Sequence, residues 1–234
     1  MNVLAVAAHP VDIEITCAGA LVKYARAGHG VTMVVMCGAD SVAGGVPLEQ
    51  WRAAWEAEAE QAAAIIGASL HLLGYPEVSI PPDDGPAMRL LEILRRVKPR
   101  VVITHAPDDG LVDHQRTSGA VEHAVNMAQT PTIEIDLPPV DVHPFLIYMD
   151  NCAGLDFQPE EYVDITDVFD LKRQMVEAHR LLNAPWQGHP VMDTMDIVEV
   201  CSRLRGLQCG VRYAEAYRRA QKWGRMAPER LLPQ

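Results

Sequence analysis

The chain of 234 residues has little positive charge, few cysteines and no long apolar run. Its 20 Lys and Arg stand against 31 Asp and Glu, a net charge of −11. Phosphate binding needs a basic face, so this balance argues against nucleic acid or an anionic membrane as a partner. No apolar stretch reaches the roughly 18 residues of a membrane span. The first residues, MNVLAVAAHP, lack the basic segment of a signal peptide and read as a strand.

The five cysteines are odd in number, far apart and never form a CxxC pair. This spacing is typical of reduced cysteines, and it predicts a cytoplasmic protein.

What the chain does have is an alternation of short apolar runs with helical patterns. The runs are rich in Val, Ile, Leu and Met, as expected for strands buried on both faces; they cover residues 3–8, 31–37, 70–73 and 101–104. Between them, apolar residues recur three or four apart over 15–27, 48–66 and 87–97. This alternation predicts an α/β fold, a three-layer doubly wound Rossmann-like domain with a mainly parallel sheet. We expect the strand order 3-2-1-4-5, because it would bring His9 and His114 to the same edge of the sheet.

The second half is less regular. Strands are expected at 145–149 and 162–165, a helix capped by Thr166 as far as about Leu182, and a final helical region over 193–223. We find no repeat and no linker, so one domain spanning 1–234 is predicted. The Met and aromatic residues of this half also predict a homo-oligomer, with contacts from residues 131–144 or from the C-terminal helices.

Two loops carry the polar residues on which chemistry could depend. His9 and Asp12 follow the first strand, in AAHPVDIE, and THAPDDGLVDHQRT contains the end of the fourth strand and the loop after it. Ligands of open α/β sheets bind beyond the carboxyl ends of the strands, and strands one and four are neighbours in the expected order. Two imidazoles and a carboxylate suit Zn²⁺. The alternative is that Asp12 caps a helix while His9 and His114 are ordinary loop residues.

The stretch HPVDIEITCAGALVKYARAGHGVTMVV resembles the opening of the PIG-L/LmbE family of zinc-dependent N-deacetylases, whose signature is HPDDxE. EAEAEQAAAIIGA, LLGYPE, THAPDDGLVDHQRT, GLDFQPEEYVDITDVFDLK and YAEAYR are similar to family segments in the same order. The resemblance implies one Zn²⁺ per chain held by His9, Asp12 and His114. It also places Asp113 beside the ligands and gives Glu14 a role in holding the start of the helix.

Two family positions are altered. The family's general base, the first aspartate of HPDD, is here Val11, and the first histidine of its HPDH motif, which stabilises the tetrahedral intermediate, is Leu111. Hydrocarbon can neither accept a proton nor donate a hydrogen bond. Trp55 aligns with an arginine that family members use for substrate contact. The expected pocket therefore comprises Val11, Leu111, Trp55, Tyr75, His105 and Asp40.

Three interpretations follow. In the first, the protein hydrolyses the amide bond of a small N-acyl substrate with another general base. The candidates for this base are Asp108, Asp109, His105 and Asp40. The carboxylates expected to take part in catalysis are Asp113, Asp109 and Asp108. In the second, the zinc serves hydration, elimination or cyclisation of a carbonyl compound, as in the family's 4-oxalomesaconate hydratases, which also lack the first aspartate. In the third, the chain is a silent zinc-binding relative. The expected partner is a small-molecule substrate.

Overall fold

A computed structural model describes residues 1–38, 47–221 and 230–234 of the chain. Within these ranges seven strands form one sheet of order β3-β2-β1-β4-β5-β7-β6. They are β1 (Asn2–Ala7), β2 (Gly30–Cys37), β3 (Ser69–Tyr75), β4 (Val101–His105), β5 (Phe145–Met149), β6 (Glu161–Asp164) and β7 (Ala214–Arg219). β1 to β5 are mutually parallel. The predicted fold class and the order 3-2-1-4-5 are therefore confirmed.

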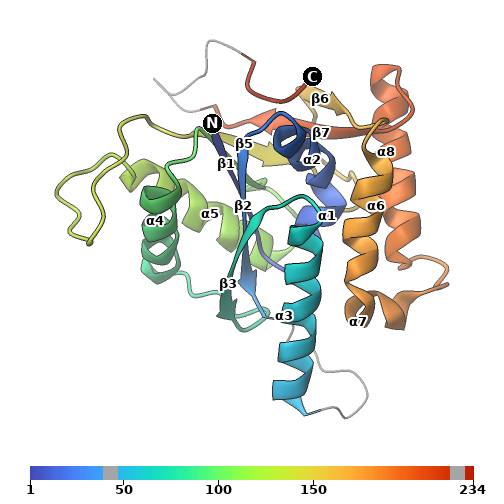
Figure 1. Cartoon of the computed structure of the whole chain (residues 1–234), viewed down its shortest axis with the longest axis horizontal. Helices are drawn as coiled ribbons and strands as arrows, with labels where there is room; N and C mark the ends of the chain where they lie inside the picture. Colours follow the sequence, from blue (N-terminus) through green and yellow to red (C-terminus); the bar gives the residue numbers. More distant parts are fainter. Residues whose placement is uncertain (39–46, 222–229) are drawn as a thin grey trace.

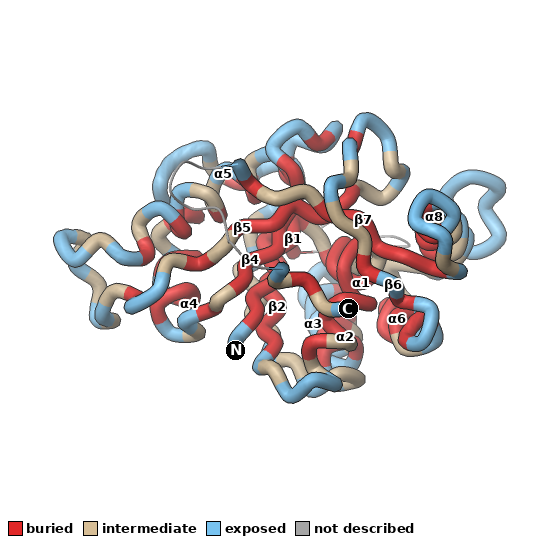
Figure 2. The backbone as a smooth tube through the Cα atoms, turned by 90° about the horizontal axis from the view of Figure 1, so that it is seen from above, coloured by how far each residue is buried: buried red, intermediate tan, exposed pale blue. Residues whose placement is uncertain are grey.

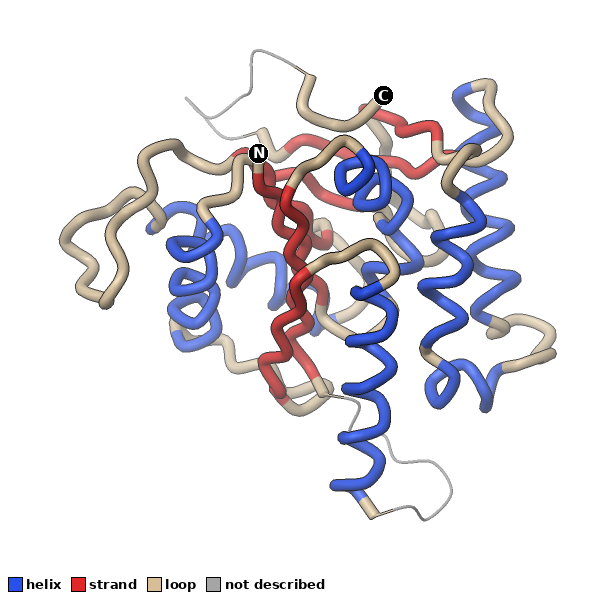
Figure 3. The backbone as a smooth tube through the Cα atoms, viewed as in Figure 1, coloured by secondary structure: helices blue, strands red, loops and turns tan. Residues whose placement is uncertain are grey.

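Helices lie on both sides of this sheet and make the three layers that Figures 1 and 3 show. α4 (Gly85–Val97) and α5 (Val112–Met127) cover one face. The other face carries α1 (Asp12–Thr16), α2 (Ala18–Arg26), α3 (Leu48–Ala64), α6 (Phe169–Ala178) and α8 (Thr194–Cys209), with α7 (Arg180–Asn183) and a 3₁₀ turn (Ala184–Trp186) between α6 and α8. Among the described helices, none is long and apolar enough to cross a membrane.

The central strands are buried on both faces because both faces are apolar. Val3 and Ala5 belong to the core under α2 and α6, while Leu4 and Val6 belong to the core under α4 and α5. All four have no exposed surface. A two-faced apolar strand is stable only between two layers of helices, which is what a parallel sheet with crossover helices provides.

The C-terminal part differs from the sequence expectation. The final helical region was expected to reach 223, but α8 ends at Cys209, and Gly210 follows in the left-handed conformation with φ 83°. Ala214–Arg219 is instead β7, antiparallel to both β5 and β6. Thr166 is not a helix cap either. Val168 precedes α6, and the Thr166 hydroxyl pairs with the backbone of Tyr213.

A buried carboxylate ties β7 to the first half of the chain. Glu215 accepts hydrogen bonds from the backbone N–H groups of Gly19 (2.7 Å) and Ala20 (2.8 Å) at the start of α2. The Lys172 ammonium of α6 donates to it at 2.7 Å. A Cβ on Gly19 would stand 2.5 Å from Ile165, so only glycine allows this close approach. These contacts fix α2 and α6 against the sheet beside the site described next.

Candidate metal centre

The candidate site lies at the carboxyl edge of the sheet, where β1 and β4 end side by side. These two strands pair in parallel, with Val3 opposite Val101 and Val6 opposite Thr104. His9 and Asp12 come from the turn between β1 and α1, while His114 lies in the first turn of α5, which follows β4. Ligand atoms of all three residues lie within 4.8 Å of one another. The sheet thus joins segments about a hundred residues apart, as the topology required.

One oxygen of Asp12 stands at the centre of three imidazoles. Asp12 Oδ2 is 3.4 Å from His9 Nδ1, 3.3 Å from His114 Nε2 and 3.4 Å from His105 Nε2. The same oxygen accepts the backbone N–H of His9 at 2.8 Å. Asp12 and His114 are buried, whereas the side chain of His9 is 24% exposed. The triad of His9, Asp12 and His114 is therefore open to solvent on its His9 side.

Two further carboxylates hold the far nitrogens of the two ligand-type histidines. His9 Nε2 is 3.0 Å from Asp113 Oδ2, and His114 Nδ1 is 3.0 Å from Asp109 Oδ1. His9 Nδ1 and His114 Nε2 are left facing Asp12. Imidazoles that bind metal ions in proteins are held in this way, with the other ring nitrogen on a carboxylate.

The residues fit a divalent cation by a second criterion. The Nε2 atom of His114, which faces Asp12, is buried, yet within the described part of the chain it makes no well-directed hydrogen bond. Buried polar atoms normally have partners. A cation between His9 Nδ1, Asp12 and His114 Nε2 would supply one, and nitrogen with carboxylate oxygen is a donor set that Zn²⁺ accepts.

The pKa shifts in the cluster indicate that its carboxylates favour a positive charge between them. Burial lowers the pKa of His114, but the carboxylates of Asp12 and Asp109 outweigh it and raise that pKa to about 10. Burial raises the pKa of Asp12, yet the surrounding imidazoles bring it well below its usual value. The carboxylates stay ionised and draw in a proton or a metal ion as their counter-charge.

Of the three candidate catalytic carboxylates, two make hydrogen bonds within the site and the third faces solvent. Asp113 Oδ2 accepts the backbone N–H of Val78 at 2.6 Å as well as contacting His9. Asp109 accepts the N–H of Leu111 at 3.0 Å. Asp108 has an exposed side chain paired with Arg218 at 2.6 Å. The structure therefore brings Asp113 and Asp109 to the site and does not bring Asp108 there.

His105 lies behind the ligands rather than in front of them. It is 1% exposed, accepts the N–H of Ala8 at Nε2 (2.9 Å), and stacks on His114 with ring centroids 3.7 Å apart. Burial lowers the pKa of His105. The ring of His105 is therefore a neutral imidazole, and by stacking it helps to hold the ring of His114 in place.

The two altered family positions flank the ligands. Val11 is half-buried and adopts a left-handed conformation with φ 75° and ψ −14°. The side chain of Leu111 is 54% exposed, at the start of α5. The remaining pocket candidates are more dispersed. Trp55 on α3 is 1% exposed and lies in a small apolar cluster. Tyr75 is the last residue of β3, and the guanidinium of Arg89 stacks over its ring. Asp40 lies outside the described residues.

Two residues near the site are not among the predicted site residues. The Sγ atom of Cys37 lies 3.9 Å from Asp113 Oδ2, so that Cys37, His9 and Asp113 form another group of metal-ligand type. Its place at the carboxyl end of β2 could have indicated this. His179 pairs with Glu14 across 3.1 Å, both buried. The two are 165 positions apart, and nothing in the sequence links them.

The comparisons with known proteins agree with this architecture. A model of the PIG-L family, described as GlcNAc-PI de-N-acetylase, matches residues 4–125. A 4-oxalmesaconate hydratase of Pseudomonas putida is 25% identical over 192 residues, covering 75% of this chain and 72% of that protein. Both a deacetylase-type family model and a hydratase are therefore similar to this sequence.

Two solved structures show the same fold. The N,N'-diacetylchitobiose deacetylase from Pyrococcus horikoshii superposes with a TM-score of 0.81 at 24% identity, over 94% of this chain and 83% of that one. The 4-carboxy-2-hydroxymuconate hydratase from Pseudomonas putida KT2440 gives 0.82 at 21% identity, over 98% and 99%. These relatives are enzymes, and their reactions differ. Because the family model covers more than half of the sequence, the chain belongs to the PIG-L family of enzymes.

Proposed function

We propose that this chain is a zinc-dependent enzyme that adds water to, or removes it from, a small unsaturated oxo acid. One Zn²⁺ per chain would be held by His9, Asp12 and His114, and residues 1–234 would act as one LmbE-like domain. The observation that carries the proposal is that no described carboxylate beside these ligands is free to act as the general base of hydrolysis. Val11 stands where the family has its base, and the described carboxylates nearest the ligands, Asp109 and Asp113, already hold histidines.

The chain's own residues orient the ligands and shape the pocket. Asp113 and Asp109 fix the ring orientations of His9 and His114, so that one nitrogen of each points at Asp12. Bound Zn²⁺ would supply Lewis-acid polarisation of a carbonyl oxygen. Val11 and Leu111 offer hydrocarbon surface next to the ligands, which suits the carbon skeleton of a substrate better than a hydrated amide.

The two reactions differ in where they need a proton acceptor. In amide hydrolysis water attacks the carbonyl carbon itself, so the base must lie beside the metal, at position 11. In conjugate hydration water attacks a carbon two bonds beyond the carbonyl carbon and loses its proton to a base near that carbon. The electron pair of the double bond moves to the carbonyl oxygen, and the carbon next to the carbonyl then takes up a proton. Loss of the base beside the metal therefore disables hydrolysis more than hydration. General bases typically contribute about 10² to 10⁴ in rate.

Amide hydrolysis of an N-acyl substrate is the second candidate. The match of the de-N-acetylase family model over residues 4–125 favours it. Of the bases considered for it, Asp109 and His105 are engaged by neighbouring groups, and Asp108 is paired with Arg218. Each of these contacts would have to break before the side chain could act on water.

The test compares wild type with Val11→Asp/Leu111→His. Protein purified without chelator is analysed for metal, then assayed for hydration of 4-oxalmesaconate by loss of conjugated ultraviolet absorbance and for deacetylation of N,N'-diacetylchitobiose. We expect hydration by wild type, and loss of both zinc and activity in His9→Ala and His114→Ala. The double variant should lose hydration and gain deacetylation by about 10² or more.

Deacetylation by the unaltered protein would establish the second candidate instead. A zinc-loaded protein inactive in both assays would favour the silent relative. A wild type that neither contains zinc nor takes it up when added would overturn the metal assignment itself.

A further inference from the structure

Cys37 is the last residue of β2, next to the turn that carries the first metal ligands. Its backbone N–H donates to the carbonyl of Ala8 at 2.8 Å, and the pairing of β2 with β3 shifts in register between Val35 and Cys37. β-Bulges, which shift the register in this way, are frequent beside active sites, where they re-aim a side chain. Cys37 is fully buried, and Figure 2 shows β1, β2 and β4 as buried backbone at the centre of the molecule.

Three donor atoms of different chemistry meet beside Cys37. Cys37 Sγ is 3.9 Å from Asp113 Oδ2, which is 3.0 Å from His9 Nε2. One ligand atom from each of the three residues lies within 4.8 Å of the other two. In a tetrahedral Zn²⁺ site the ligand atoms stand about 3.3–3.6 Å apart, because Zn–S is about 2.3 Å and Zn–N or Zn–O about 2.1 Å. The group is therefore close to the size that a zinc ion requires.

One oxygen of Asp113 has no hydrogen-bond partner in the part of the chain that the structure describes. Asp113 is only 4% exposed. Its Oδ2 accepts the N–H of Val78 and contacts His9, whereas its Oδ1 is buried and receives no hydrogen bond from a described residue. Buried carboxylate oxygens normally have partners, and an unpaired one is unfavourable. A cation held beside Cys37 and this carboxylate would supply the partner.

The ring of His9 connects this group to the first metal site. Its Nδ1 is 3.4 Å from Asp12 Oδ2, on the side of the first site, and its Nε2 is 3.0 Å from Asp113 Oδ2, on the side of Cys37. A neutral imidazole has one nitrogen with a lone pair and one N–H. It can therefore bind only one ion at a time, and two ions would compete for it.

We propose that Cys37, His9 and Asp113 form a second, inhibitory zinc site, which fills when zinc is in excess and withdraws His9 from the first ion. Thiolate and imidazole ligands select zinc over Mg²⁺ or Ca²⁺. On binding, the Cys37 thiol loses its proton to solvent, and the proton of the His9 ring passes from Nε2 to Nδ1. The thiolate and the Asp113 carboxylate then balance the charge of the ion. Only the inhibitory effect rests on the proposed function, because it requires the first zinc site.

Titration of the metal-free protein with Co²⁺, which takes the place of zinc, tests the second site. A cobalt–thiolate bond gives an intense near-ultraviolet charge-transfer band, and we expect this band with the second equivalent but not with the first. Cys37→Ala should bind the first equivalent as wild type does and lack the band. Its second equivalent should bind about 100-fold or more weakly, since losing even an outer partner of a ligand costs about 10–100-fold. Cys37→Ser, which keeps the size of the side chain, should lack the band too.

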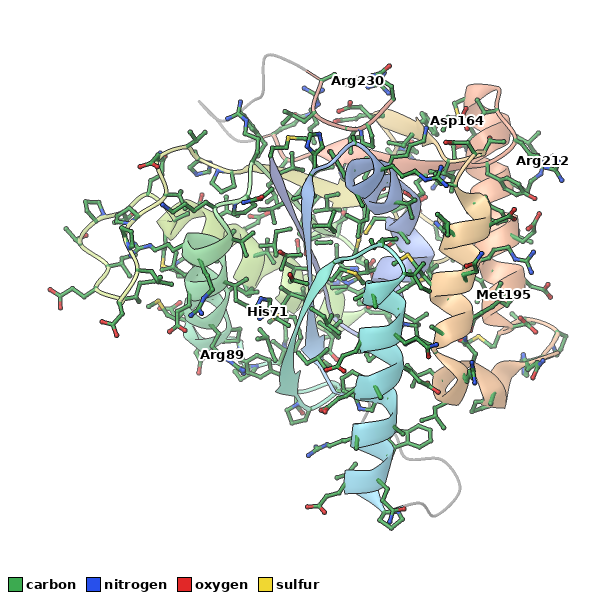
Figure 4. All side chains as sticks on the ribbon, in the orientation of Figure 1. His71, Arg89, Asp164, Met195, Arg212 and Arg230 are labelled. Atoms are coloured by element: carbon green, nitrogen blue, oxygen red, sulfur yellow. The ribbon has the colours of Figure 1, made fainter. Side chains whose placement is uncertain are left out.

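Two variants are controls for this titration. Cys17→Ala replaces another fully buried cysteine and should keep the band. His71→Ala controls for metal bound by an ordinary histidine. Figure 4 shows His71 on β3, and it belongs to none of the metal-ligand groups among the described residues. Circular dichroism confirms that each variant folds.

Excess zinc tests the inhibitory role, in whichever assay of the proposed function wild type is active. Cys37→Ala should raise the zinc concentration for half-inhibition by about 100-fold, and Cys17→Ala should leave it unchanged. Equal inhibition of wild type and Cys37→Ala would overturn this role.

The number of cobalt ions separates the possible failures. One equivalent bound without a thiolate band, even in excess cobalt, would overturn the second site and leave the first zinc assignment standing. No cobalt bound at all would overturn both. A thiolate band with the first equivalent would overturn the inhibitory role and the assignment of the stronger site to His9, Asp12 and His114.

Discussion

Val11 stores conformational strain that can be measured. Its φ of 75° and ψ of −14° lie in the left-handed region, and its carbonyl accepts the N–H of Ile15 at 3.0 Å as α1 begins. A Cβ in this region costs about 1–2 kcal/mol, and β-branched residues are the least suited to it. Asparagine tolerates it far better. The perturbation that exposes the strain is Val11→Asn, measured against Val11→Thr.

The comparison with threonine isolates the backbone effect. Val11 is half-buried, so either polar replacement sacrifices about 1 kcal/mol of apolar burial, roughly half the value for a fully buried valine. Both residues also cap helices, so a capping gain would appear in both variants. Only threonine retains the β-branch. We expect the Val11→Asn variant to be more stable than the Val11→Thr variant by about 1 kcal/mol, or about 2–4 °C in Tm for a chain of this size.

Urea unfolding and calorimetry in the presence of a chelator give both numbers without a contribution from metal binding. Val78, with φ 60° and 76% exposure, is an independent second case. Because little burial is lost there, Val78→Asn should be more stable than wild type outright, again by about 1 kcal/mol. A Val11→Thr variant as stable as the Val11→Asn variant would refute the reasoning.

Two further predictions concern groups around the site. Asp109→Asn should lower zinc affinity by about 10–100-fold, because the orienting carboxylate of a ligand histidine is lost; a chromophoric chelator measures this, and Asp108→Asn should leave affinity unchanged. The pKa of His179 is lowered by burial but raised more by Glu14, so it lies above 6.5 in the folded protein. Its stabilising effect is therefore full below pH 6.5 and lost as the pH rises through the folded pKa. In urea unfolding the stability difference between wild type and His179→Gln should shrink with rising pH, and a flat difference would contradict the assignment.

The parallel half of the fold could be predicted because its signal is local. Strands such as β1 and β4 are continuous apolar runs, and the helices between them show clear apolar spacing. β7 could not be predicted in this way. Its sequence, AEAYRR, consists largely of good helix formers. It is a strand because β5 and β6 pair with it on either side, and no pattern within six residues reveals such partners.

Some residues of the site could likewise be predicted from the sequence, and others could not. The resemblance supplied His9, Asp12 and His114, and the structure brings them together. It could not distinguish Asp108 from Asp109, which are neighbours of the same type. Their roles separate only in three dimensions, since Asp109 turns inward to His114 while Asp108 turns outward to Arg218. Cytoplasmic location and homo-oligomerisation stay predictions of the sequence.

The strain at Val11 bears on the choice between the two reactions. Strained residues persist where the surrounding structure over-determines them, and they cluster at functional sites. Here a β-branched residue stands in an unfavourable conformation between two ligand-type residues, at a position where an aspartate or asparagine would be less strained. Folding alone therefore does not explain a valine at this position. The proposed hydration is compatible with a valine here, because its water attacks a carbon away from the metal, whereas hydrolysis loses the base that the family places at this position.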